Sequence, residues 1–217
     1  MTRGVFVTGT DTGVGKTFSA CVLIHALAAH GLRVAAMKPV AAGSDEDTLA
    51  LMRAAGIDAS RKAEVTPVLL RDAIAPHIAA AREGRRIDLA PLQRALGQLA
   101  ASADFVVVEG VGGFAVPLAP ALDTVDLARA FALPVVLVVG MRLGCLNHAL
   151  LTQHAIANAG LAFSGWIANA VDPEMQAAED NVAALRERLR APLLGRLPYS
   201  PGTDPATLAA RLDVAAL

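Results

Sequence analysis

The stretch VFVTGTDTGVGKT, residues 5–17, constrains the fold more than any other part of the chain. An apolar run stops at Gly9, a glycine-rich turn follows, and Lys16 and Thr17 open a helix-like segment. Backbone N–H groups in such a turn can surround phosphate oxygens, and the start of the following helix also favours an anion. We therefore predict a phosphate-binding loop, with Lys16 reaching the outer phosphates and Thr17 placing its hydroxyl on Mg²⁺.

Apolar runs alternate with helix-like segments along the rest of the chain. Several runs are apolar at successive positions, which favours a parallel sheet buried on both faces. This alternation predicts one α/β domain over residues 1–217, a doubly wound, mostly parallel sheet of the P-loop NTPase kind with helices on both faces. The expected strands are 3–9, 33–40, 103–110, 133–140, 163–171 and 192–198, and the expected helices are 15–30, 45–55, 88–102, 124–132, 145–159 and 174–190.

Composition narrows the partners that the chain can have. With 217 residues, 54% of them hydrophobic, and a net charge of -1, the chain can bury one core but has no basic footprint for nucleic acid. No apolar stretch reaches the roughly 18 residues that span a bilayer, and the first run is too short for a signal peptide. We expect a cytoplasmic protein, with no membrane partner, whose two cysteines are buried small hydrophobes. The five histidines show no metal-like spacing.

Ligands of doubly wound sheets lie beyond the carboxyl ends of the strands, so the residues that follow each strand are candidates for a site. Lys38 follows the second strand and is either a ligand-binding lysine or a solvated surface lysine. The acidic run Asp45, Glu46 and Asp47 then opens a helix. These acids either complement the helix dipole or bind Mg²⁺, and spacing alone leaves both open.

Three more strand ends carry polar or glycine-rich segments. Glu109 ends the strand 103–110 and is the expected second carboxylate for Mg²⁺, while Gly112 beyond it lets the backbone approach a ligand. The turn 141–148 leads into another helix start and could bind a second anion. Asn169 either reads a base edge, since an amide both donates and accepts, or is a simple turn residue.

Taken together, these stretches resemble the dethiobiotin synthetases, the ATP-dependent cyclising ligases of biotin synthesis. The similarity runs in order through nearly the whole chain. The combination of GTDTGVGKT, KPV and VEGVGG is specific. Five residues separate Gly9 from Gly15 where four are usual, and this looks like the family's own variant. The matching stretches are 7–17, 38–43, 108–113, 133–152, 165–169 and 191–198.

The resemblance implies a reaction. Diaminopelargonic acid, a vicinal diamine, would take up CO₂ or bicarbonate at one amine to form a carbamate. The carbamate oxygen would attack the γ-phosphate of ATP and give a carbamic–phosphoric mixed anhydride. The second amine would then close the ureido ring and expel phosphate. Catalytic roles fall on Lys16, which would hold the β/γ-phosphates, and on Lys38 and Thr12, which would bind the carbamate.

The resemblance also implies the binding residues. Mg²⁺ would be held by Thr17, Asp47 and Glu109, with Asp47 preferred to Asp45 because it precedes Leu49-Ala50-Leu51. Ala42 stands where many relatives carry a hydroxyl, so one substrate hydrogen bond would be missing. The nucleotide would contact Gly13, Val14, Gly15, Lys16, Thr17, Glu109, Gly112, Asn169 and Pro198, and the substrate Thr12, Lys38, Ala42, Gly144, Cys145, Leu146 and Asn147.

A homodimer is a further implication. In the family that the chain resembles, the partner's turn equivalent to 144–147 holds the substrate carboxylate, so the site lies at a two-fold interface. The helix 145–159 would form part of that interface through its apolar positions Leu146, Ala149, Leu150 and Ile156.

Two other classes of protein share the phosphate loop. A switch of the partitioning-ATPase type has the same fold, but usually carries a second lysine early in the loop, where this chain has Gly9-Thr10. A cobyrinate amidase would need a glutaminase domain, for which 217 residues leave no room.

Overall fold

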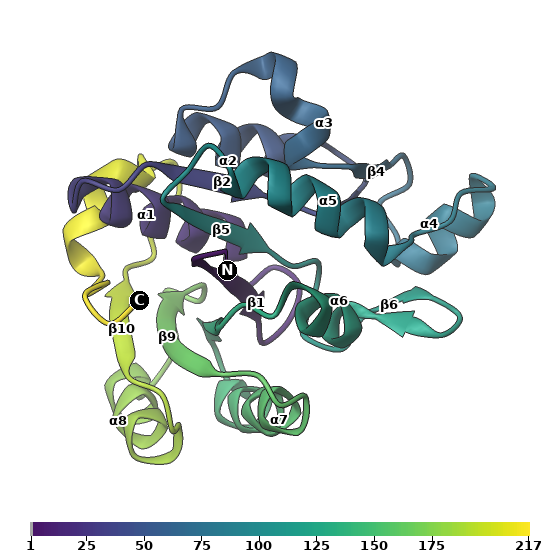
Figure 1. The fold of residues 1–217 in the computed structure, drawn as a ribbon. Helices are drawn as coiled ribbons and strands as arrows, with labels where there is room; N and C mark the ends of the chain where they lie inside the picture. The colour runs from purple at the N-terminus through teal and green to yellow at the C-terminus, as the bar shows by residue number, and fades with distance from the viewer. Residues whose placement is uncertain (1) are drawn as a thin grey trace.

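A six-stranded sheet forms the centre of the computed structural model, which describes residues 2–217 (Figure 1). The strand order is β10-β9-β8-β1-β5-β2, and every neighbouring pair is parallel. The carboxyl end of β1, between β5 and β8, is therefore the switch point at which such sheets bind ligands. The strands are β1 Gly4–Gly9, β2 Val34–Met37, β5 Phe105–Glu109, β8 Val135–Met141, β9 Phe163–Ala170 and β10 Leu193–Leu197.

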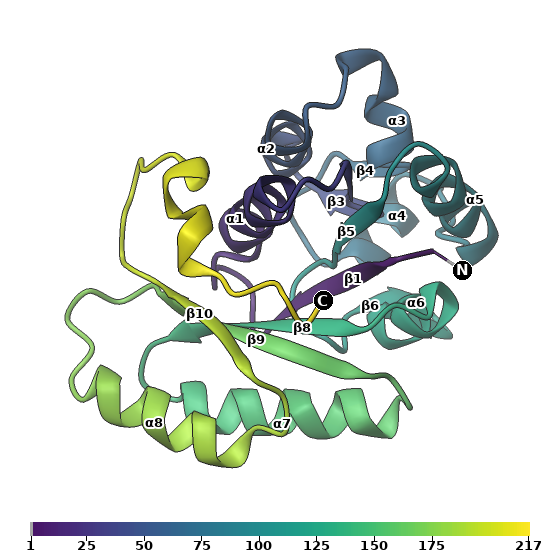
Figure 2. The same cartoon turned by 60° about the vertical axis from the view of Figure 1, so that its left-hand side comes forward.

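Helices cover both faces of this sheet (Figure 2). One face packs against α1 (Lys16–Ala29) and the 3-10 helix η2 (Pro205–Arg211). The other packs against α5 (Leu89–Ala100), α6 (Thr124–Phe131), α7 (Cys145–Asn158) and α8 (Ala178–Arg188). Within β8, Val136 and Val138 join the α1 side of the core, while Leu137 and Val139 join the α7 side. Burial on both faces explains the continuous apolar runs, and the predicted doubly wound α/β fold is confirmed.

Two predicted elements differ from the structure in their bounds. The expected strand 33–40 ends at Met37, and the chain resumes after Pro39 as β3 (Val40–Ala42), which belongs to a separate two-stranded sheet with β4 (Val68–Leu70). The expected helix 174–190 begins only at Ala178, after Ala177 in a left-handed conformation. Apolar periodicity does not mark either break.

The region between β3 and β5 contains elements that the sequence did not predict. Helix α2 (Glu46–Ala55) was expected, but η1 (Ala59–Arg61), α3 (Lys62–Val65) and α4 (Pro76–Arg82) were not. A small hairpin, β6 (Pro117–Ala119) with β7 (Leu122–Asp123), follows β5. Helix α4 and the hairpin lie toward the carboxyl end of the sheet on the side of β2 and β5 (Figure 1), whereas η1 lies by its amino end, where Arg61 donates to Ser102.

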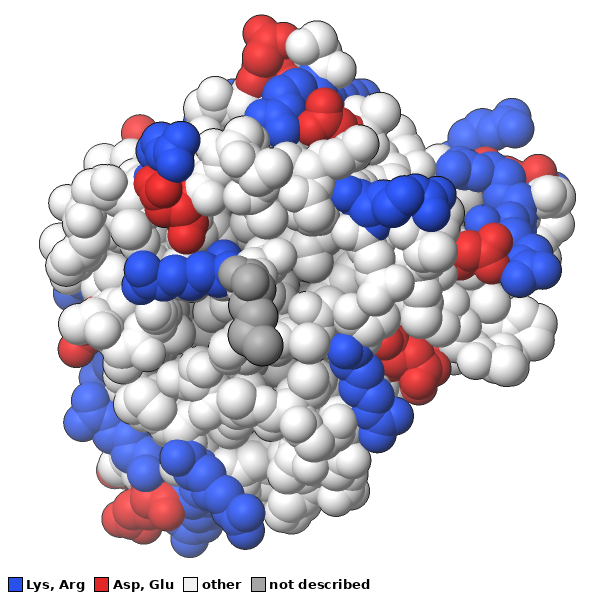
Figure 3. All heavy atoms as spheres, viewed as in Figure 1, with Lys and Arg blue, Asp and Glu red and all other residues white. Residues whose placement is uncertain are grey.

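The surface carries charges of both signs. On the face that Figure 3 draws, blue and red side chains are interspersed over a largely uncharged surface. Among residues 2–217, no helix combines the length and the apolar character that a membrane crossing requires.

Candidate active site

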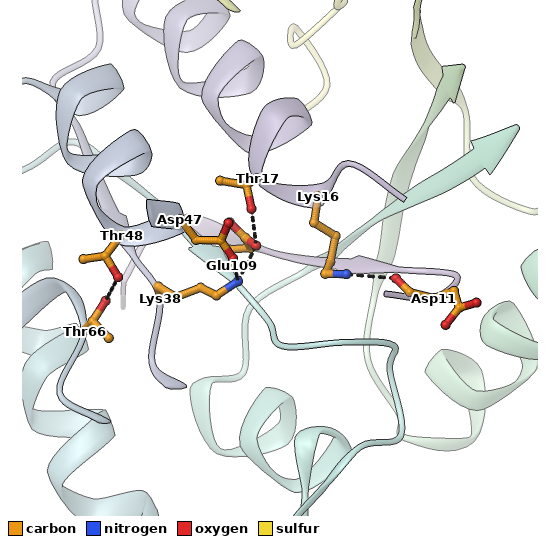
Figure 4. A network of polar contacts seen from close by, with 8 residues as sticks. All are labelled: Asp11, Lys16, Thr17, Lys38, Asp47, Thr48, Thr66 and Glu109. Atoms are coloured by element: carbon orange, nitrogen blue, oxygen red, sulfur yellow. Dashed lines mark hydrogen bonds and ion pairs between the residues drawn. The ribbon is translucent and has the colours of Figure 1, made fainter. Parts of the chain in front are cut away.

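The turn from β1 into α1 forms the predicted loop. Gly15 has a φ of 78°, and a Cβ there would collide with the amide nitrogen of Asn169, so the position requires glycine. Lys16, the first residue of α1, lies back over the loop and donates from Nζ to the backbone oxygen of Asp11 at 2.9 Å (Figure 4). Burial lowers the pKa of Lys16 to about 8. A negative charge bound in the loop would therefore raise the pKa of Lys16 again and stabilise its charged form.

A cluster of charges from three other elements lies beside this loop. Lys38, just beyond β2, donates from Nζ to Glu109 Oε1 at 2.5 Å and to Asp47 Oδ2 at 2.9 Å. Thr17 Oγ1 donates to the same Glu109 oxygen at 2.9 Å. Figure 4 shows these side chains converging from α1, α2 and the ends of β2 and β5. Side chains that are far apart in sequence thus meet at one point.

The charges in this cluster stabilise one another. Burial alone would lower the pKa of Lys38, but the negative charges of Glu109 and Asp47 and the hydrogen bonds to them outweigh it and raise the pKa. Burial alone would likewise raise the pKa of Asp47, and Lys38 reverses that, so the pKa is lowered. Lys38 is therefore a buried cation and Asp47 an anion at neutral pH.

A cavity of about 820 Å³ opens over the loop and the charge cluster. Its lining combines the polar residues of the loop and the charge cluster with small and apolar residues, including Ala42, Ile74 and Val116. Of the predicted site residues, ten line this cavity: Thr12, Gly13, Gly15, Lys16, Thr17, Lys38, Ala42, Asp47, Glu109 and Gly112. Val14 does not, because its side chain is buried between Gly9 and Gly140.

The donor set at the bottom of the cavity suits a hard divalent cation. Glu109 Oε2 is buried and has no hydrogen-bond partner among the described residues. Mg²⁺ is usually held by one or two carboxylates together with substrate phosphates, and it keeps several waters. Thr17 Oγ1, Asp47 and Glu109 provide that set beside the phosphate loop. Asp45 differs, because it forms an ion pair with Lys62 and does not line the cavity.

A second cleft adjoins the first. Gly13 lines both, and the second also contains Asn169, Pro198 and Tyr199. The amide nitrogen of Asn169 donates to the backbone oxygen of Val14 at 2.9 Å, so this side chain also holds the phosphate loop. The two residues predicted to contact adenine therefore share one cleft at the outer side of the loop.

The protein named ATP-dependent dethiobiotin synthetase BioD in Aromatoleum aromaticum is 52% identical over 218 residues, 97% of this chain and 96% of that protein. A protein of the same name in Nitrosospira multiformis is 51% identical, over 99% of this chain and 96% of its own length. A family model described as an AAA domain matches residues 3–207.

The chain belongs to the dethiobiotin synthetase family. Solved structures at lower identity share its fold. The septum site-determining protein MinD of Pyrococcus horikoshii, solved with Mg-ADP, has a TM-score of 0.61 at 20% identity, covering 98% of this chain and 87% of that one. MinD of Pyrococcus furiosus has a TM-score of 0.55 at 20% identity, covering 97% and 96%. At these identities the likeness to MinD concerns the fold alone.

The turn predicted from the family to bind substrate does not reach the cavity of its own chain. Gly144, Cys145, Leu146 and Asn147 line neither cleft. Cys145 is buried, with its thiol toward Asn181, and its backbone N–H donates to Arg142 within the turn. The Cys145 thiol therefore faces the chain's own core, and a contact between this turn and the substrate of a second copy stays a prediction.

Two of the four apolar positions proposed for the dimer interface, Ala149 and Ile156, need correction. Ala149 and Ile156 are fully buried in the chain's own core, and Leu146 and Leu150 are partly buried against it. The apolar side chains that reach solvent here are instead Leu143, 96% exposed, and Leu151, 59% exposed. Helical periodicity detects an apolar face but does not say what covers it.

Sequence reasoning assigned no role to two residues at the site. Asp11 lies in the loop, accepts from Thr12 N at 2.7 Å and pairs at 2.6 Å with Arg142, which follows β8. Arg142 lies in the turn 141–148, which follows a predicted strand, so its position could have suggested a contact with the site. Its pairing with Asp11, 131 positions away, could not be read from spacing.

Proposed function

We propose that the chain is an ATP-dependent dethiobiotin synthetase, a ligase that converts diaminopelargonic acid and CO₂ into dethiobiotin while ATP becomes ADP and phosphate. One observation carries the proposal. In a chain about half identical to proteins of that name, Lys16, Thr17, Lys38, Asp47 and Glu109 line a single cavity beside a phosphate loop.

Mg²⁺ is part of this proposal. Thr17, Asp47 and Glu109 would hold it, and the unpaired Glu109 Oε2 supports this choice because a buried carboxylate oxygen without a donor is costly. The cation would neutralise charge on the β- and γ-phosphates of ATP. Asp47 rather than Asp45 is the ligand, since Asp45 is already paired with Lys62 outside the cavity.

The chemistry divides between the two lysines. One amine of the substrate attacks CO₂ and loses a proton, giving a carbamate that Thr12 and Lys38 bind. The carbamate oxygen attacks the γ-phosphorus, ADP leaves, and Lys16 stabilises the charge on the transferred group. The second amine then attacks the carbamate carbon, phosphate leaves, and the ureido ring closes. Lys38 suits the carbamate because it is a buried cation that follows β2 and does not belong to the phosphate loop.

The remaining contacts follow from the two clefts. Adenine would lie by Asn169 and Pro198, and the phosphates would run along Gly13, the backbone of Val14, Gly15 and Gly112. The apolar residues of the cavity lining, with Ala42, would face the substrate.

The substrate carboxylate would be held by the turn Gly144 to Asn147 of a second copy, since this chain's own turn lies away from its cavity. Leu143 and Leu151, both strongly exposed, would be covered in that homodimer. Mixing two inactive variants tests this: Lys16→Ala, and Asn147→Trp in the turn. If sites are shared, mixed dimers contain one intact site and part of the activity returns. Proven subunit exchange without recovery would refute the shared site.

A nucleotide switch of the partitioning-ATPase type is the alternative. It has structural neighbours of that fold in its favour, but the loop has no second lysine at Gly9-Thr10. The two functions differ in what triggers hydrolysis. A synthetase consumes ATP only when its small substrates are present, whereas a switch hydrolyses slowly alone and responds to a macromolecule.

The deciding experiment is a phosphate-release assay with ATP and Mg²⁺, run with and without diaminopelargonic acid and bicarbonate, with dethiobiotin identified by mass spectrometry. We expect release to require both substrates, and Lys16→Ala to lose on the order of 10²-fold or more in rate while remaining folded. Equal release without the diamine would refute the proposed function.

A further inference from the structure

Two buried hydroxyls near the site belong to neither cleft. Thr48 lies in the first turn of α2, next to Asp47, and Thr66 follows α3. Their Oγ1 atoms are 2.7 Å apart, and both residues are buried (Figure 4). Nothing in the proposed reaction uses either group, because neither lines the cavity.

The segment that carries Thr66 contacts both parts of the chain that bring charges to the cavity. We call residues 62–68 the bracing segment. Val65 accepts from the backbone N–H of Lys38 at 2.8 Å, and Val68 N donates to the oxygen of Pro39 at 3.3 Å. The bracing segment therefore holds the backbone directly at Lys38.

The same segment holds the start of α2. Thr66 bonds to Thr48, and Lys62 pairs with Asp45 at the N-cap. Both charges of the Lys62 pair are partly exposed, so water and salt screen that contact. Of the buried residues of α2, which are Thr48, Leu51 and Met52, Thr48 alone lies in the first turn. Its hydrogen bond is the buried, directional contact at this end of the helix.

We propose that the Thr48–Thr66 hydroxyl pair is a positioning contact for Asp47. Successive residues of an α-helix point about 100° apart, so fixing the direction of Thr48 toward the bracing segment also fixes the direction of Asp47 toward the cavity. Asp47 then lies at 2.9 Å from Lys38, which the same segment holds. Thr48 and Thr66 are thus positioning residues for the carboxylate, and their link to Mg²⁺ rests on the proposed function of Asp47.

Stability alone gives little reason for such a pair. A buried hydrogen bond between neutral groups contributes little net stability, and replacing both partners by apolar groups of the same shape is often nearly neutral. Valine has the shape of threonine without the hydroxyl. The double variant Thr48→Val/Thr66→Val leaves no buried hydroxyl unpaired, so it folds even if a single variant does not.

Calorimetry with ADP tests the proposal without turnover. The quantity measured is the gain in ADP affinity on adding Mg²⁺. We expect the double variant to lose about five-fold of this gain, the size of one neutral hydrogen bond, and to bind ADP without metal as the parent does. The single variant Thr48→Ser, which keeps the hydroxyl, should show the same gain in ADP affinity as the parent. In an Asp47→Asn background the double substitution has no further effect, because the carboxylate it positions is gone.

Thr152→Val is the matched control, since Thr152 is also buried and helical but its hydroxyl bonds to its own helix at His148. A double variant that keeps the full Mg²⁺ gain, or that loses it equally with Asn at position 47, overturns the proposal. The proposal is also overturned if the ADP affinity of the parent does not change when Mg²⁺ is added. Absence of dethiobiotin formation by the parent would instead refute the proposed function and leave the positioning result to stand.

Discussion

Strands β2 and β5 carry an ion pair at each end, and the two pairs have opposite environments. At the amino ends, Arg33 pairs with Asp104 at 2.7 Å, with side chains 72% and 38% exposed. At the carboxyl ends, Lys38 pairs with Glu109 at 2.5 Å, with side chains 4% and 1% exposed. The strands between them run in register from Val34 opposite Phe105 to Met37 opposite Val108. The same two strands thus place similar charges in water and in the interior.

The difference shows where this chain accepts an energetic cost. An exposed pair gains little but loses little, because its charges stay hydrated. A buried pair gives up hydration, and apolar residues in its place are often as stable or more so. The buried pair lies on the cavity, and no donor among residues 2–217 reaches Glu109 Oε2, whereas Asp104 has three hydrogen bonds from Arg33. This contrast supports the role proposed for the pair at the carboxyl end.

The largest expected difference between the two ends is in turnover. Lys38→Gln should lower the rate of dethiobiotin formation by on the order of 10²–10³-fold, because it removes a buried cation from the reacting carbamate. ADP binding by calorimetry should change by only a few-fold. Arg33→Gln at the other end is the matched control and should leave the rate unchanged. Loss of ADP binding with an intact response to the diamine would reverse the assignment of Lys38.

Stability should respond in the opposite sense to activity. The double variant Lys38→Met/Glu109→Leu replaces the buried pair by apolar side chains, and we expect it to be inactive but as stable as the parent, or more stable by about 1–4 kcal/mol. Urea unfolding measures this. If the double variant were less stable than the parent by a similar amount, the buried pair would be structural and the comparison of the two ends would fail.

The requirement for Mg²⁺ should separate the carboxylates. Asp47→Asn and Glu109→Gln should each raise the Mg²⁺ concentration for half-maximal activity by roughly ten-fold or more, since loss of even an outer-shell partner costs that much. Asp45→Asn, two residues earlier and paired with Lys62, should have a mild effect. Steady-state kinetics over a Mg²⁺ series measures all three. A critical Asp45 and a neutral Asp47 would show that the wrong carboxylate was chosen.

The carboxyl ends of these strands could be predicted from the sequence. Glu109 and Lys38 were found because each follows an apolar run in a fold whose ligands lie at strand ends. The central sheet was predictable for the same reason: runs such as 133–140 are apolar without interruption and bounded by proline or glycine. These signals lie within single segments of the sequence, so they can be recognised without knowing which segments pack together.

Contacts between distant segments could not be predicted in this way. β3 and β4 are three residues each, too short to show a period of their own, and α2, η1 and α3 separate them in the sequence. The apolar positions Ala149 and Ile156 of α7 are equally consistent with a partner or with the chain's own core, and they proved to be core. Thr48 and Thr66 have no motif, and only their 2.7 Å contact identifies them.

The smallest expected effect is on the stability that the exposed Arg33–Asp104 pair contributes at low pH. Hydrogen bonds from the Arg33 side chain and backbone lower the pKa of Asp104 to about 2, below its ordinary value of 3.8. A carboxylate with a lowered folded pKa contributes stability that is complete above its unfolded pKa and is lost as the pH falls through the folded one. The contribution should therefore fade between about pH 4 and pH 2 and be absent in Asp104→Asn. Because the pair is exposed, we expect only a small drop in Tm at neutral pH, reduced further by salt, with turnover unchanged. Thermal unfolding of parent and variant over a pH series measures the difference, which should vanish near pH 2. A difference that persisted in strong acid, or a loss of turnover, would mean that the amino end of these strands is coupled to the site after all.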